Sequence, residues 1–420
     1  MSLSLRALTL ACLALASSAT ARDILVVDQA GGPGFDFLEL DAAVASAQNG
    51  DVLIVREGDY GGWILIDGKG LSLVGEAGAE VLVQDVDIRN LAAGQTASLT
   101  NLKIRSTGNT GSDTVLSLGI RDCAGAVWLQ DCTVRTRTVG LVAVGGPAEV
   151  IDCDQVGFAR CTLSGELDPG GFAFFFGGPG LFVQNSTVTI HQSDLLGTTG
   201  VAGTTGPGPA GLEVASSTVF LSDSILRGGQ GAAGASQLGF CTNGAEGGPG
   251  LLLGEGDPQV RTQDVTLVPG AGGPGGVGVP GPFCAAGPDG VESTVTSGSV
   301  LPVAAGPRSL HVTTPVREGE TLTSTYTGVE GDLIFGFWSL NAGVSPIFAE
   351  LGGSFLPAIP VTTLTYHGLA PLGGEVALTV QVQELGVPGV TIYVQALFGN
   401  VSEGLVLSNG TQTVLLDGSL

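Results

Sequence analysis

The sequence is poor in positive charge, in aromatic side chains and in long apolar runs. It contains two lysines, Lys69 and Lys103, against a formal net charge of -24. Such a surface repels nucleic acid and anionic lipid, because it has no basic patch to bind them. Beyond the N-terminus no apolar stretch is long enough to span a membrane. The composition therefore argues against nucleic-acid-binding and transmembrane proteins.

Glycine is abundant and unevenly placed. There are 70 glycines in 420 residues, with 5% aromatic and 13% charged residues. The glycines cluster, and the segments between the clusters are rich in Val, Leu and Ile. This pattern indicates a folded core interrupted by Gly-rich loops. The strict every-third glycine of collagen is absent, so a triple helix is excluded.

The first residues predict export. Arg6 is followed by an apolar run from Ala7 to Ala16, and Ala19-Thr20-Ala21 is a small-x-small cleavage site. These features predict a signal peptide over residues 1–21, a mature chain from Arg22, and a secreted or cell-surface location. Leu10-Ala11-Cys12 leaves lipidation of Cys12 as an alternative.

Two stretches have similar sequences: "GLFVQNSTVTIHQSDLLG" from Gly180 and "GLEVASSTVFLSDSILRG" from Gly211. "GIRDCAGAVWLQDCTVRT" from Gly119 aligns with them without gaps, and "VGFARCTLSG" repeats the second half. Apolar residues alternate within each copy, which predicts short strands and no helix. A thin unit repeated in this way predicts a solenoid of parallel strands with internal Val, Leu and Ile ladders.

The copies differ in length because of inserts between them. The inserts include "ELDPGGFAFFFGGP", "TTGVAGTTGPGPA", "GQGAAGASQLGFCTNGAEGGP" and "AGGPGGVGVPGPFCAAGPDG". All follow the end of one copy and precede the next, so they should leave the same corner of the coil. Their Gly and Pro content predicts extended polyproline-like runs that lie side by side.

Six cysteines remain after Cys12, and an even number in an exported chain predicts disulfides. Cys241 and Cys284 lie in adjacent inserts and are predicted to pair. Cys132 and Cys161 share a column of the repeat, so a disulfide between them would leave Cys123 with Cys153. Pairing within each coil (Cys123 to Cys132 and Cys153 to Cys161) is the alternative.

The N-terminal segment resembles a known family. "DILVVDQAGGPGFDFLELDAAVASAQNGDVLIVREGDYGGWILIDGKGLSLVGEAG" is similar to the start of the pectin-lyase-like right-handed parallel β-helix proteins. The resemblance covers residues 23–298 and implies a short helix over residues 41–48 that caps the first coil. The family contains lyases, hydrolases, esterases and non-enzymatic surface proteins, so the resemblance implies a fold and no particular activity.

The predicted architecture is all-β, in three parts. Residues 1–21 are the signal peptide, and residues 22–298 form a right-handed single-stranded parallel β-helix with an N-terminal capping helix. Residues 299–420 read as short strands with turn breaks, such as "DLIFGFWSL" and "VTIYVQALF", which predicts a small β-sandwich. This C-terminal module is predicted to act as a cap or an attachment module.

Catalytic motifs of the family's carbohydrate-active branches are absent. The three histidines, His191, His311 and His367, lack the Gly-His-Gly setting of polygalacturonases. Asp85, Asp87 and Arg89 are catalytic candidates, because two carboxylates and an arginine at alternate positions could share one outward face of a strand. The alternative is an ordinary solvated strand.

Two further groups are candidates for ligand binding. A column of polar residues should stack along the helix axis and could follow a sugar chain or hold calcium; it comprises Asp131, Arg160, Gln192, Asp223 and Asp264. The alternative is an ordinary polar ladder, beside which His191 would face solvent. The aromatic run in one insert, which comprises Phe172, Phe174, Phe175 and Phe176, could contact a partner or sugar rings, or pack on neighbouring inserts.

These observations predict a monomeric secreted or cell-surface protein with a structural, adhesive or polysaccharide-binding role. Its partner would be a polysaccharide or another cell-surface component, and no cofactor is expected apart from a possible calcium ion. The alternative is a polysaccharide lyase or glycoside hydrolase with an atypical active site, acting on an acidic polysaccharide.

Overall fold

The computed structural model describes residues 23–106, 116–138, 144–167, 176–200, 206–237, 240–278, 281, 283–340, 342–348, 353–357 and 361–420. The predicted signal peptide, Cys12 and three of the four clustered phenylalanines, Phe172, Phe174 and Phe175, lie outside these residues. Phe176 begins a two-residue strand.

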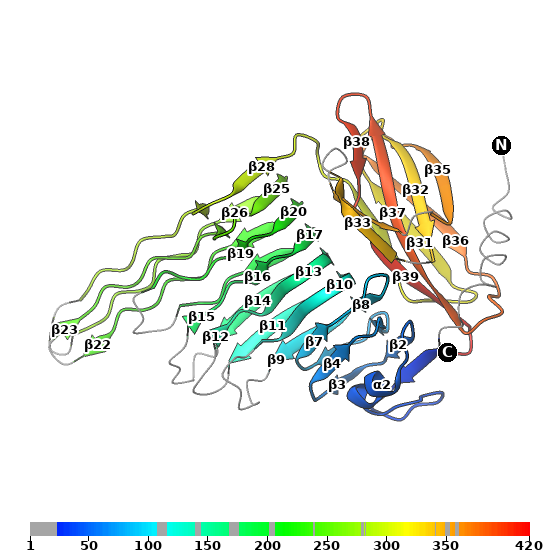
Figure 1. Ribbon diagram of the computed structural model, residues 1–420, viewed down its shortest axis with the longest axis horizontal. Coiled ribbons are helices and arrows are strands. Elements are labelled where there is room, and N and C mark those ends of the chain that lie inside the picture. Colours follow the sequence, from blue (N-terminus) through cyan, green and yellow to red (C-terminus); the bar gives the residue numbers. More distant parts are fainter. Residues whose placement is uncertain are drawn as a thin grey trace.

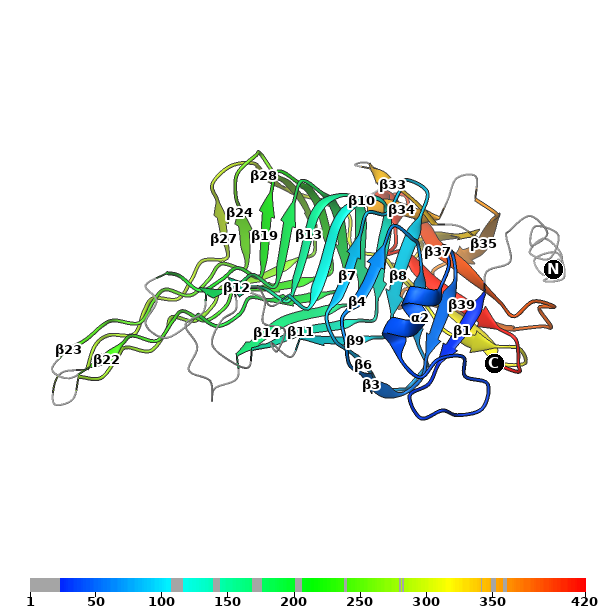
Figure 2. The ribbon, with the colours of Figure 1, turned by 60° about the horizontal axis from the view of Figure 1, so that its bottom comes forward.

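The N-terminal part is a right-handed parallel β-helix whose coils have three faces (Figures 1 and 2). Face 1 contains β1 (Ile24–Val27), β2 (Val52–Val55), β5 (Ser72–Gly75), β8 (Thr96–Thr100), the second halves of β10 (Leu118–Gln130) and β13 (Ala148–Ala159), β17 (Thr187–His191), β20 (Thr218–Ser222), β25 (Gln259–Gln263) and β28 (Ser299–Pro302). Face 2 contains β4 (Ile64–Asp67), β7 (Val86–Arg89), the first halves of β10 and β13, β16 (Leu181–Gln184), β19 (Leu212–Ala215), β24 (Leu251–Leu253) and β27 (Ser293–Val295). Face 3 contains β3 (Gly58–Tyr60), β6 (Val81–Val83), β9 (Lys103–Ser106), β11 (Thr133–Thr138), β14 (Thr162–Leu167), β18 (Asp194–Leu196), β21 (Ile225–Arg227) and β26 (Thr266–Val268).

The predicted repeat is confirmed in its second half and wrong in its first half for the copy at Gly119. Val127, Val156 and Val188 lie in one register, as do Leu129, Phe158 and Ile190. Gly119, however, pairs with Glu149 and through it with Phe182, two residues beyond Gly180. The gapless alignment fails because β10 and β13 bend across the corner between faces 2 and 1, where their register shifts between Cys123 and Ala126.

Polar residues form the two insert-free corners because the backbone there is left-handed. From face 2 to face 1 the residues with positive φ are Asn90, Asp122, Asp152, Asn185, Ser216 and Asp257. From face 1 to face 3 they are Asn101, Asp131, Arg160, Gln192, Asp223 and Asp264. Asn and Asp tolerate this conformation better than most other residues. The third corner, from face 3 to face 2, carries the inserts.

A short helix covers the first coil. Helix α2 (Leu40–Ser46) buries Leu40, Ala43 and Val44 on the start of the apolar ladder. At its C-terminal end, the Lys69 ammonium donates hydrogen bonds to the carbonyls of Val44 (2.5 Å) and Ala47 (2.9 Å). Seven residues are too few for an isolated helix, so burial and this cation at the negative end of the helix stabilise it.

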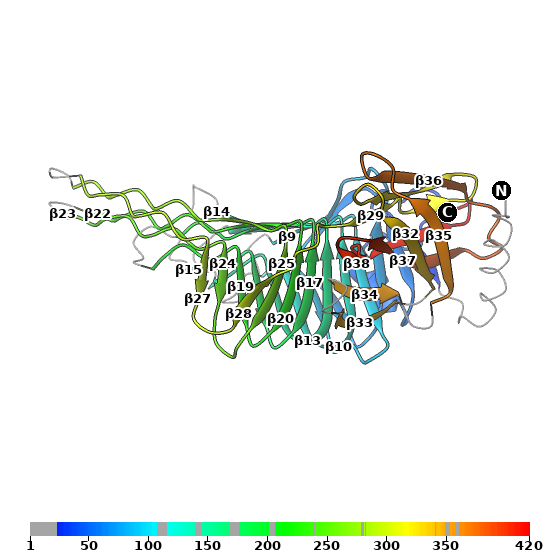
Figure 3. The same cartoon turned by 90° about the horizontal axis from the view of Figure 1, so that it is seen from above.

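The Gly-rich inserts form a projecting arm of extended chains that lie side by side (Figures 2 and 3). Their backbones are joined by hydrogen bonds, among them Gly231 N to Ala271 O (2.9 Å), Gly248 N to Gly229 O (2.8 Å) and Gly273 N to Ala245 O (2.8 Å). A Cβ at Gly231, Gly248 or Gly273 would collide with a neighbouring carbonyl, so only glycine permits this spacing. The inserts also contain two short strand pairs. One is antiparallel and joins β22 (Ser236–Gln237) to β23 (Phe240–Cys241), and the other is parallel and joins β12 (Val144–Gly145) to β15 (Phe176–Gly177).

The structure forms one of the predicted disulfides. Cys241 and Cys284 are bonded, and they join two neighbouring inserts at the far end of the arm. Cys123, Cys132, Cys153 and Cys161 are buried free thiols, so the other predicted pairings are absent. Cys123 does lie opposite Cys153, and Cys132 does contact Cys161.

These four thiols occupy positions where later coils carry serine. Cys153 N donates to Ser186 Oγ and Cys161 N donates to Ser193 Oγ, each at 3.0 Å. The Cys161 thiol donates back to the Ala159 carbonyl (3.4 Å), just as Ser193 Oγ donates to the His191 carbonyl (2.8 Å). Parallel stacking at about 4.8 Å keeps neighbouring Cβ atoms roughly that far apart, outside the usual 3.5–4.5 Å of a disulfide. The thiols therefore line the inner turns as serine does.

The C-terminal part is a sandwich of mainly antiparallel sheets, in which only the pairing of β30 with β39 is parallel among the described strands. One sheet contains β29 (Ser309–Val312), β31 (Thr321–Thr327) and β36 (Glu375–Gln381). The second contains β30 (Val316–Arg317), β39 (Thr411–Leu416), β37 (Gly389–Asn400), β32 (Leu333–Ser339) and β35 (Thr363–Leu369), with β38 (Gly404–Leu407) paired to β37. A further hairpin contains β33 (Ala342–Phe348) and β34 (Gly353–Pro357).

The sandwich lies alongside face 1 of the early coils rather than over the end of the β-helix (Figure 1). Val414 and Leu416 pack on Val52, Ile54 and Val74. Farther along, Leu356 and Tyr393 pack on Trp128 and its neighbours, and Gln130 Oε1 accepts hydrogen bonds from Thr411 Oγ1 and Gln412 N, both at 2.8 Å. The last coil runs to Pro302 in β28, so the boundary expected after residue 298 falls inside it.

Candidate functional site

Charged side chains gather on the outer surface of face 2, across the first coils. Asp67 of β4, Arg89 of β7 and Arg121 of β10 lie in register on three successive rungs. Asp87 of β7 and Glu149 of β13 lie in the next column, two rungs apart. Because side chains alternate across a strand, all five point outward. We call these five residues the carboxylate–arginine strip.

Arg121 connects the two carboxylates of that second column. Its Nε donates to Glu149 Oε1 (2.5 Å), its Nη2 also contacts this oxygen, and its Nη1 lies 3.4 Å from Asp87 Oδ1. At the other end of the strip, Arg89 Nε lies 3.3 Å from Asp67 Oδ2, and Asn90 Nδ2 donates to Asp67 Oδ1 (2.8 Å). The strip therefore contains two neighbouring groups of ion pairs, Asp67 with Arg89 and Arg121 with Asp87 and Glu149, spread over four strands.

Asp87 is the most deeply placed carboxylate of the strip. Its burial raises the pKa of this carboxyl group above its ordinary value, and the positive charges of Arg121 and Arg89 only partly oppose the rise. The residue between Asp87 and Glu149 in the column is Gly119, where a Cβ would come within 3.0 Å of Asp87 Oδ1 and 3.3 Å of Arg121 Nη1. Leu116 Cδ2 lies 3.2 Å from the same point, so the buried Gly119 lets three side chains pack closely over the backbone.

An aromatic side chain borders the strip. Trp63, just before β4, is 53% exposed, and the Arg89 guanidinium carbon lies 6.0 Å from its ring centroid. An indole with one face toward solvent offers an apolar platform, and a guanidinium at this distance is attracted to the ring. Trp63, Arg89 and Arg121 together combine a flat apolar surface with several hydrogen-bond donors.

The structure brings together only two of the three catalytic candidates. Asp87 and Arg89 share the outward surface of β7, as expected. Asp85 does not share that surface, because it precedes the strand with a φ of 31°, at the corner between faces 3 and 2. Burial raises the pKa of Asp85, and its Oδ1 has no hydrogen-bond partner among the described residues.

The predicted polar column lies at the corner between faces 1 and 3. Arg160 forms a bidentate pair with Asp131 (2.7 and 2.9 Å), and Gln192 Nε2 donates to Asp223 Oδ2 (3.2 Å). Arg160 Nη1 also donates to the carbonyl of Leu310 (3.3 Å), in the C-terminal sandwich. Asp264, the last member, is exposed. These contacts favour the structural alternative, a polar ladder that helps to seat the sandwich.

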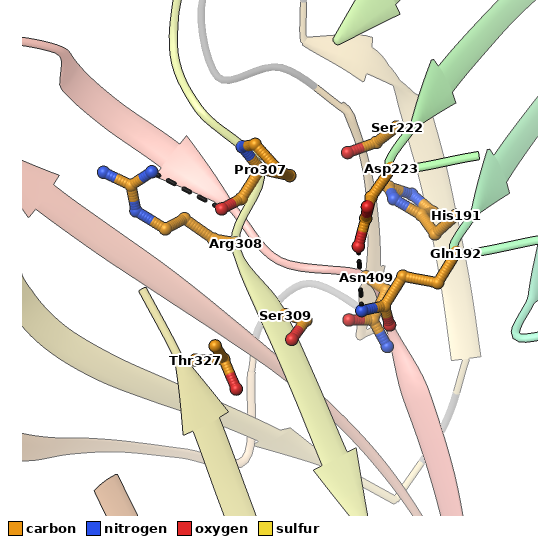
Figure 4. Close-up of a pocket in the computed structure, with 9 residues that line it drawn as sticks. All are labelled: His191, Gln192, Ser222, Asp223, Pro307, Arg308, Ser309, Thr327 and Asn409. Atoms are coloured by element: carbon orange, nitrogen blue, oxygen red, sulfur yellow. Dashed lines mark hydrogen bonds between the residues drawn. The ribbon is translucent and has the colours of Figure 1, made fainter. Parts of the chain in front are cut away.

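A small cavity of about 140 Å³ lies between this column and the sandwich (Figure 4). Its lining residues are His191, Gln192, Ser222, Asp223, Pro307, Arg308, Ser309, Thr327 and Asn409. Ligand pockets commonly measure about 300–1,000 Å³, so this space suits a few water molecules better than a sugar ring. We interpret it as a packing gap between the two parts of the chain.

His191 corrects one expectation. It was predicted to face solvent, yet it is buried beneath the sandwich, with its ring 5.5 Å from that of Phe220. Burial, assisted by the charge of Arg160, lowers the pKa of His191 to about 4. The imidazole is therefore neutral at pH 7 and belongs to the interface.

Two features are absent from the part of the chain that the structure describes. There, no three or more His, Cys, Asp or Glu side chains are arranged to hold a metal ion, so the calcium ion considered from the sequence has no such group. Within the same residues no helix has the length and apolar character needed to cross a membrane.

Comparison with known proteins gives a likeness of fold. No protein family and no curated protein matches the sequence. Among solved structures, a pectin methylesterase in complex with a hexasaccharide is 16% identical and has a TM-score of 0.33, with 50% of this chain and 71% of that chain covered. Pectin methylesterase PemA from Erwinia chrysanthemi is 15% identical, also at a TM-score of 0.33, with 58% and 80% covered. At these identities and TM-scores the likeness assigns neither a family nor an activity to this chain.

Four residues of the site were not predicted from the sequence: Trp63, Asp67, Arg121 and Glu149. They lie in or directly before three strands, β4, β10 and β13, and no local motif connects them. The signal that could have found them is the register of the early coils, which brings outward charged residues of successive rungs into two neighbouring columns. That register was obscured by the bend in β10.

Proposed function

We propose that this protein acts outside the cell by binding an extended polysaccharide across the carboxylate–arginine strip. The observation that supports this proposal is the gathering of ion-paired carboxylates and guanidiniums on the outer surface of a parallel sheet, bordered by the half-exposed Trp63. Sugar hydroxyls both donate and accept hydrogen bonds, so they can contact the carboxylate oxygens and the guanidinium N–H groups of such a strip.

The shape of the site also supports a polymer as the ligand. The strip extends across four parallel strands, β4, β7, β10 and β13, and adjacent strands lie about 4.8 Å apart. A single sugar would contact only part of it, whereas a chain crossing the strands would contact the indole and both arginines. Trp63 would support a sugar ring by its apolar face.

The test is binding to a panel of neutral and acidic polysaccharides, measured by retardation in glycan-containing gels and by calorimetry. Trp63→Ala and Arg121→Gln are expected to weaken binding at least about tenfold, which corresponds to about 1.4 kcal/mol. The matched controls are Tyr366→Ala, an exposed aromatic of the sandwich, and Arg227→Gln, which forms an exposed ion pair with Asp194 on face 3. Equal effects of the site and control variants would refute the proposal.

A second candidate function is cleavage of the bound polysaccharide by lyase or hydrolase chemistry. The observation that favours it is Asp87, a buried carboxyl group whose raised pKa suits proton transfer, next to the Arg121 guanidinium 3.4 Å away. Unsaturated products or new reducing ends that disappear in Asp87→Asn, and persist in the exposed turn variant Asp122→Asn, would establish it. Binding without either product in the wild type would leave the binding role alone.

A further inference from the structure

The four buried thiols of the β-helix lie in two successive coils and form two facing pairs. Cys123 of β10 lies in register with Cys153 of β13 at the corner between faces 2 and 1, and their side chains are in hydrogen-bonding contact. Cys132 and Cys161 make the same contact at the corner between faces 1 and 3. None of the four is in a disulfide.

The fold does not require sulfur at these corners. Ser186 follows Cys153 in the same column of the next coil, and Ser217 follows Ser186. The Ser186 hydroxyl donates to the Gln184 carbonyl (2.7 Å). The Cys153 thiol donates in the same way to the Ile151 carbonyl (3.2 Å). Serine thus forms the same turn, and a thiol adds a different property, since a thiolate is a ligand for soft metal ions.

The spacing of the rungs suits an ion between two sulfurs better than a bond between them. Neighbouring parallel strands lie about 4.8 Å apart, which keeps the Cβ atoms of Cys123 and Cys153 too distant for a disulfide. Two collinear metal–sulfur bonds of about 2.3 Å each span about 4.6 Å, close to this spacing. Among the described residues no third His, Cys, Asp or Glu joins the pair. Zinc and calcium take more protein ligands than two, so the pair suits a soft ion that accepts two sulfurs.

The pair at the corner between faces 2 and 1 lies close to the surface, beneath carboxylates. Cys123 directly follows the exposed Asp122, and Cys153 lies between the exposed Asp152 and Asp154. These negative charges raise the concentration of cations at the turn that covers the thiols. An ion therefore reaches this pair from the acidic side of the corner.

The pair of Cys132 and Cys161 has different surroundings. Arg160, directly before Cys161, is held in a bidentate ion pair with Asp131 (2.7 and 2.9 Å). Arg160 also donates to the carbonyl of Leu310 in the sandwich (3.3 Å). An ion approaching this corner meets a guanidinium and the sandwich instead of open carboxylates, so this second pair is a built-in control.

We propose that Cys123 and Cys153 bind one copper(I) ion in a two-coordinate site. Sulfur ligands select this soft ion over the harder divalent ions. The S–H bond of Cys123 breaks, its proton passes to water, and the thiolate of Cys123 and the neutral sulfur of Cys153 each form a Cu–S bond, while copper remains in the +1 state. Exchange of one proton for one monovalent ion leaves the charge of the buried corner unchanged, which avoids the cost of burying a net charge.

The test is titration of copper(I), kept reduced by ascorbate, into a chain produced without residues 1–21, in competition with a coloured copper(I) chelator. The wild type is expected to bind about one ion per chain, with sulfur neighbours at about 2.3 Å in X-ray absorption spectra. Cys123→Ser and Cys153→Ser should each weaken binding at least about a hundredfold, since even the loss of a group that only orients a ligand costs about 10–100-fold. Both variants are expected to fold, because later coils carry serine in this column.

The matched control is the double variant Cys132→Ser/Cys161→Ser, which removes two buried thiols from the same two coils. It should keep the affinity of the wild type for copper(I). The proposal is overturned if the wild type binds copper(I) no more tightly than Cys123→Ser/Cys153→Ser does, or if the control loses as much affinity as that variant. It is also overturned if the absorption spectra show oxygen or nitrogen neighbours in place of sulfur, as for an ion held adventitiously on surface carboxylates.

Discussion

Arg308 is expected to be the most sensitive single charge in the C-terminal sandwich. Its guanidinium and the carboxylate of Asp332 are both 0% exposed and form an ion pair. Arg308 also donates to the carbonyl of Gly306 (2.8 Å) and to Glu403 Oε2 (3.1 Å), and Asn400 Nδ2 donates to Asp332 Oδ1 (2.7 Å). Removing one partner of a buried pair leaves a buried charge without its counter-ion, which costs about 3–5 kcal/mol.

Arg308→Met should therefore lower the free energy of unfolding of the sandwich by about 3–5 kcal/mol. At about 4–8 °C per kcal/mol, the corresponding transition in scanning calorimetry falls by roughly 12 °C or more. The double variant Arg308→Met/Asp332→Leu should recover a large part of this loss, because replacing a whole buried pair by apolar side chains is often near neutral.

The matched control is Arg227→Met, which removes an ion pair whose side chains are 40% and 43% exposed. That change should cost less than about 1 kcal/mol. The reasoning is refuted if Arg308→Met costs no more than this control, or if the double variant is as unstable as the single one.

Three further outcomes are expected. Burial lowers the pKa of both His191 and His367 to about 4, below the ordinary value of 6.5, so between these pH values the unfolded chain binds more protons than the native chain. The stability that these neutral histidines contribute should be complete above about pH 6.5 and fall as the pH drops toward 4. Urea titrations at several pH values can measure this fall, which should be smaller in His367→Gln. Thiol titration of a chain produced without residues 1–21 should find no reactive cysteine in the native state and four under denaturing, non-reducing conditions. None would react under either condition if the inner cysteines were bonded. Gly273→Ala should open the arm, because its Cβ would collide with the Ala232 carbonyl, and faster amide exchange in residues 228–249, with no change in the core coils, is the measurement.

The coils could be predicted from the sequence because the interactions that determine them lie within one repeat and between neighbouring repeats. Alternating apolar residues and a recurring Gly-Leu start predict strands, and the equivalent rungs from Val127 to Ile190 stack as expected. The place of the inserts followed from the same alignment, and their hydrogen-bonded packing agrees with the expected extended runs. In both cases neighbouring copies of one pattern determine the structure.

The expectations that failed depended on three-dimensional detail. The predicted columns of cysteines are correct, but the predicted disulfides within them are not formed. Spacing in the sequence gives the column, whereas the positions of the Cβ atoms decide whether a disulfide can form. His191 was misplaced because its burial comes from a sandwich more than a hundred residues away. The strip went unseen because Arg121 and Glu149 meet only after the bend in β10 is known.

The arm separates the residues that make its framework from those that face outward. One extended segment of the arm, residues 270–277, alternates with a period of three. Gly270, Gly273 and Gly276 are buried among neighbouring backbones, while Ala271, Pro274 and Val277 are exposed to solvent. Most of this packing uses main-chain atoms, supplemented by a few side chains such as Asp289, which accepts a hydrogen bond from Gly272 N (3.0 Å), and by the Cys241–Cys284 disulfide. The side chains at the outward positions of this segment can therefore change without disturbing it. The arm is thus a scaffold on which the outward side chains can be substituted one by one while the backbone architecture stays constant.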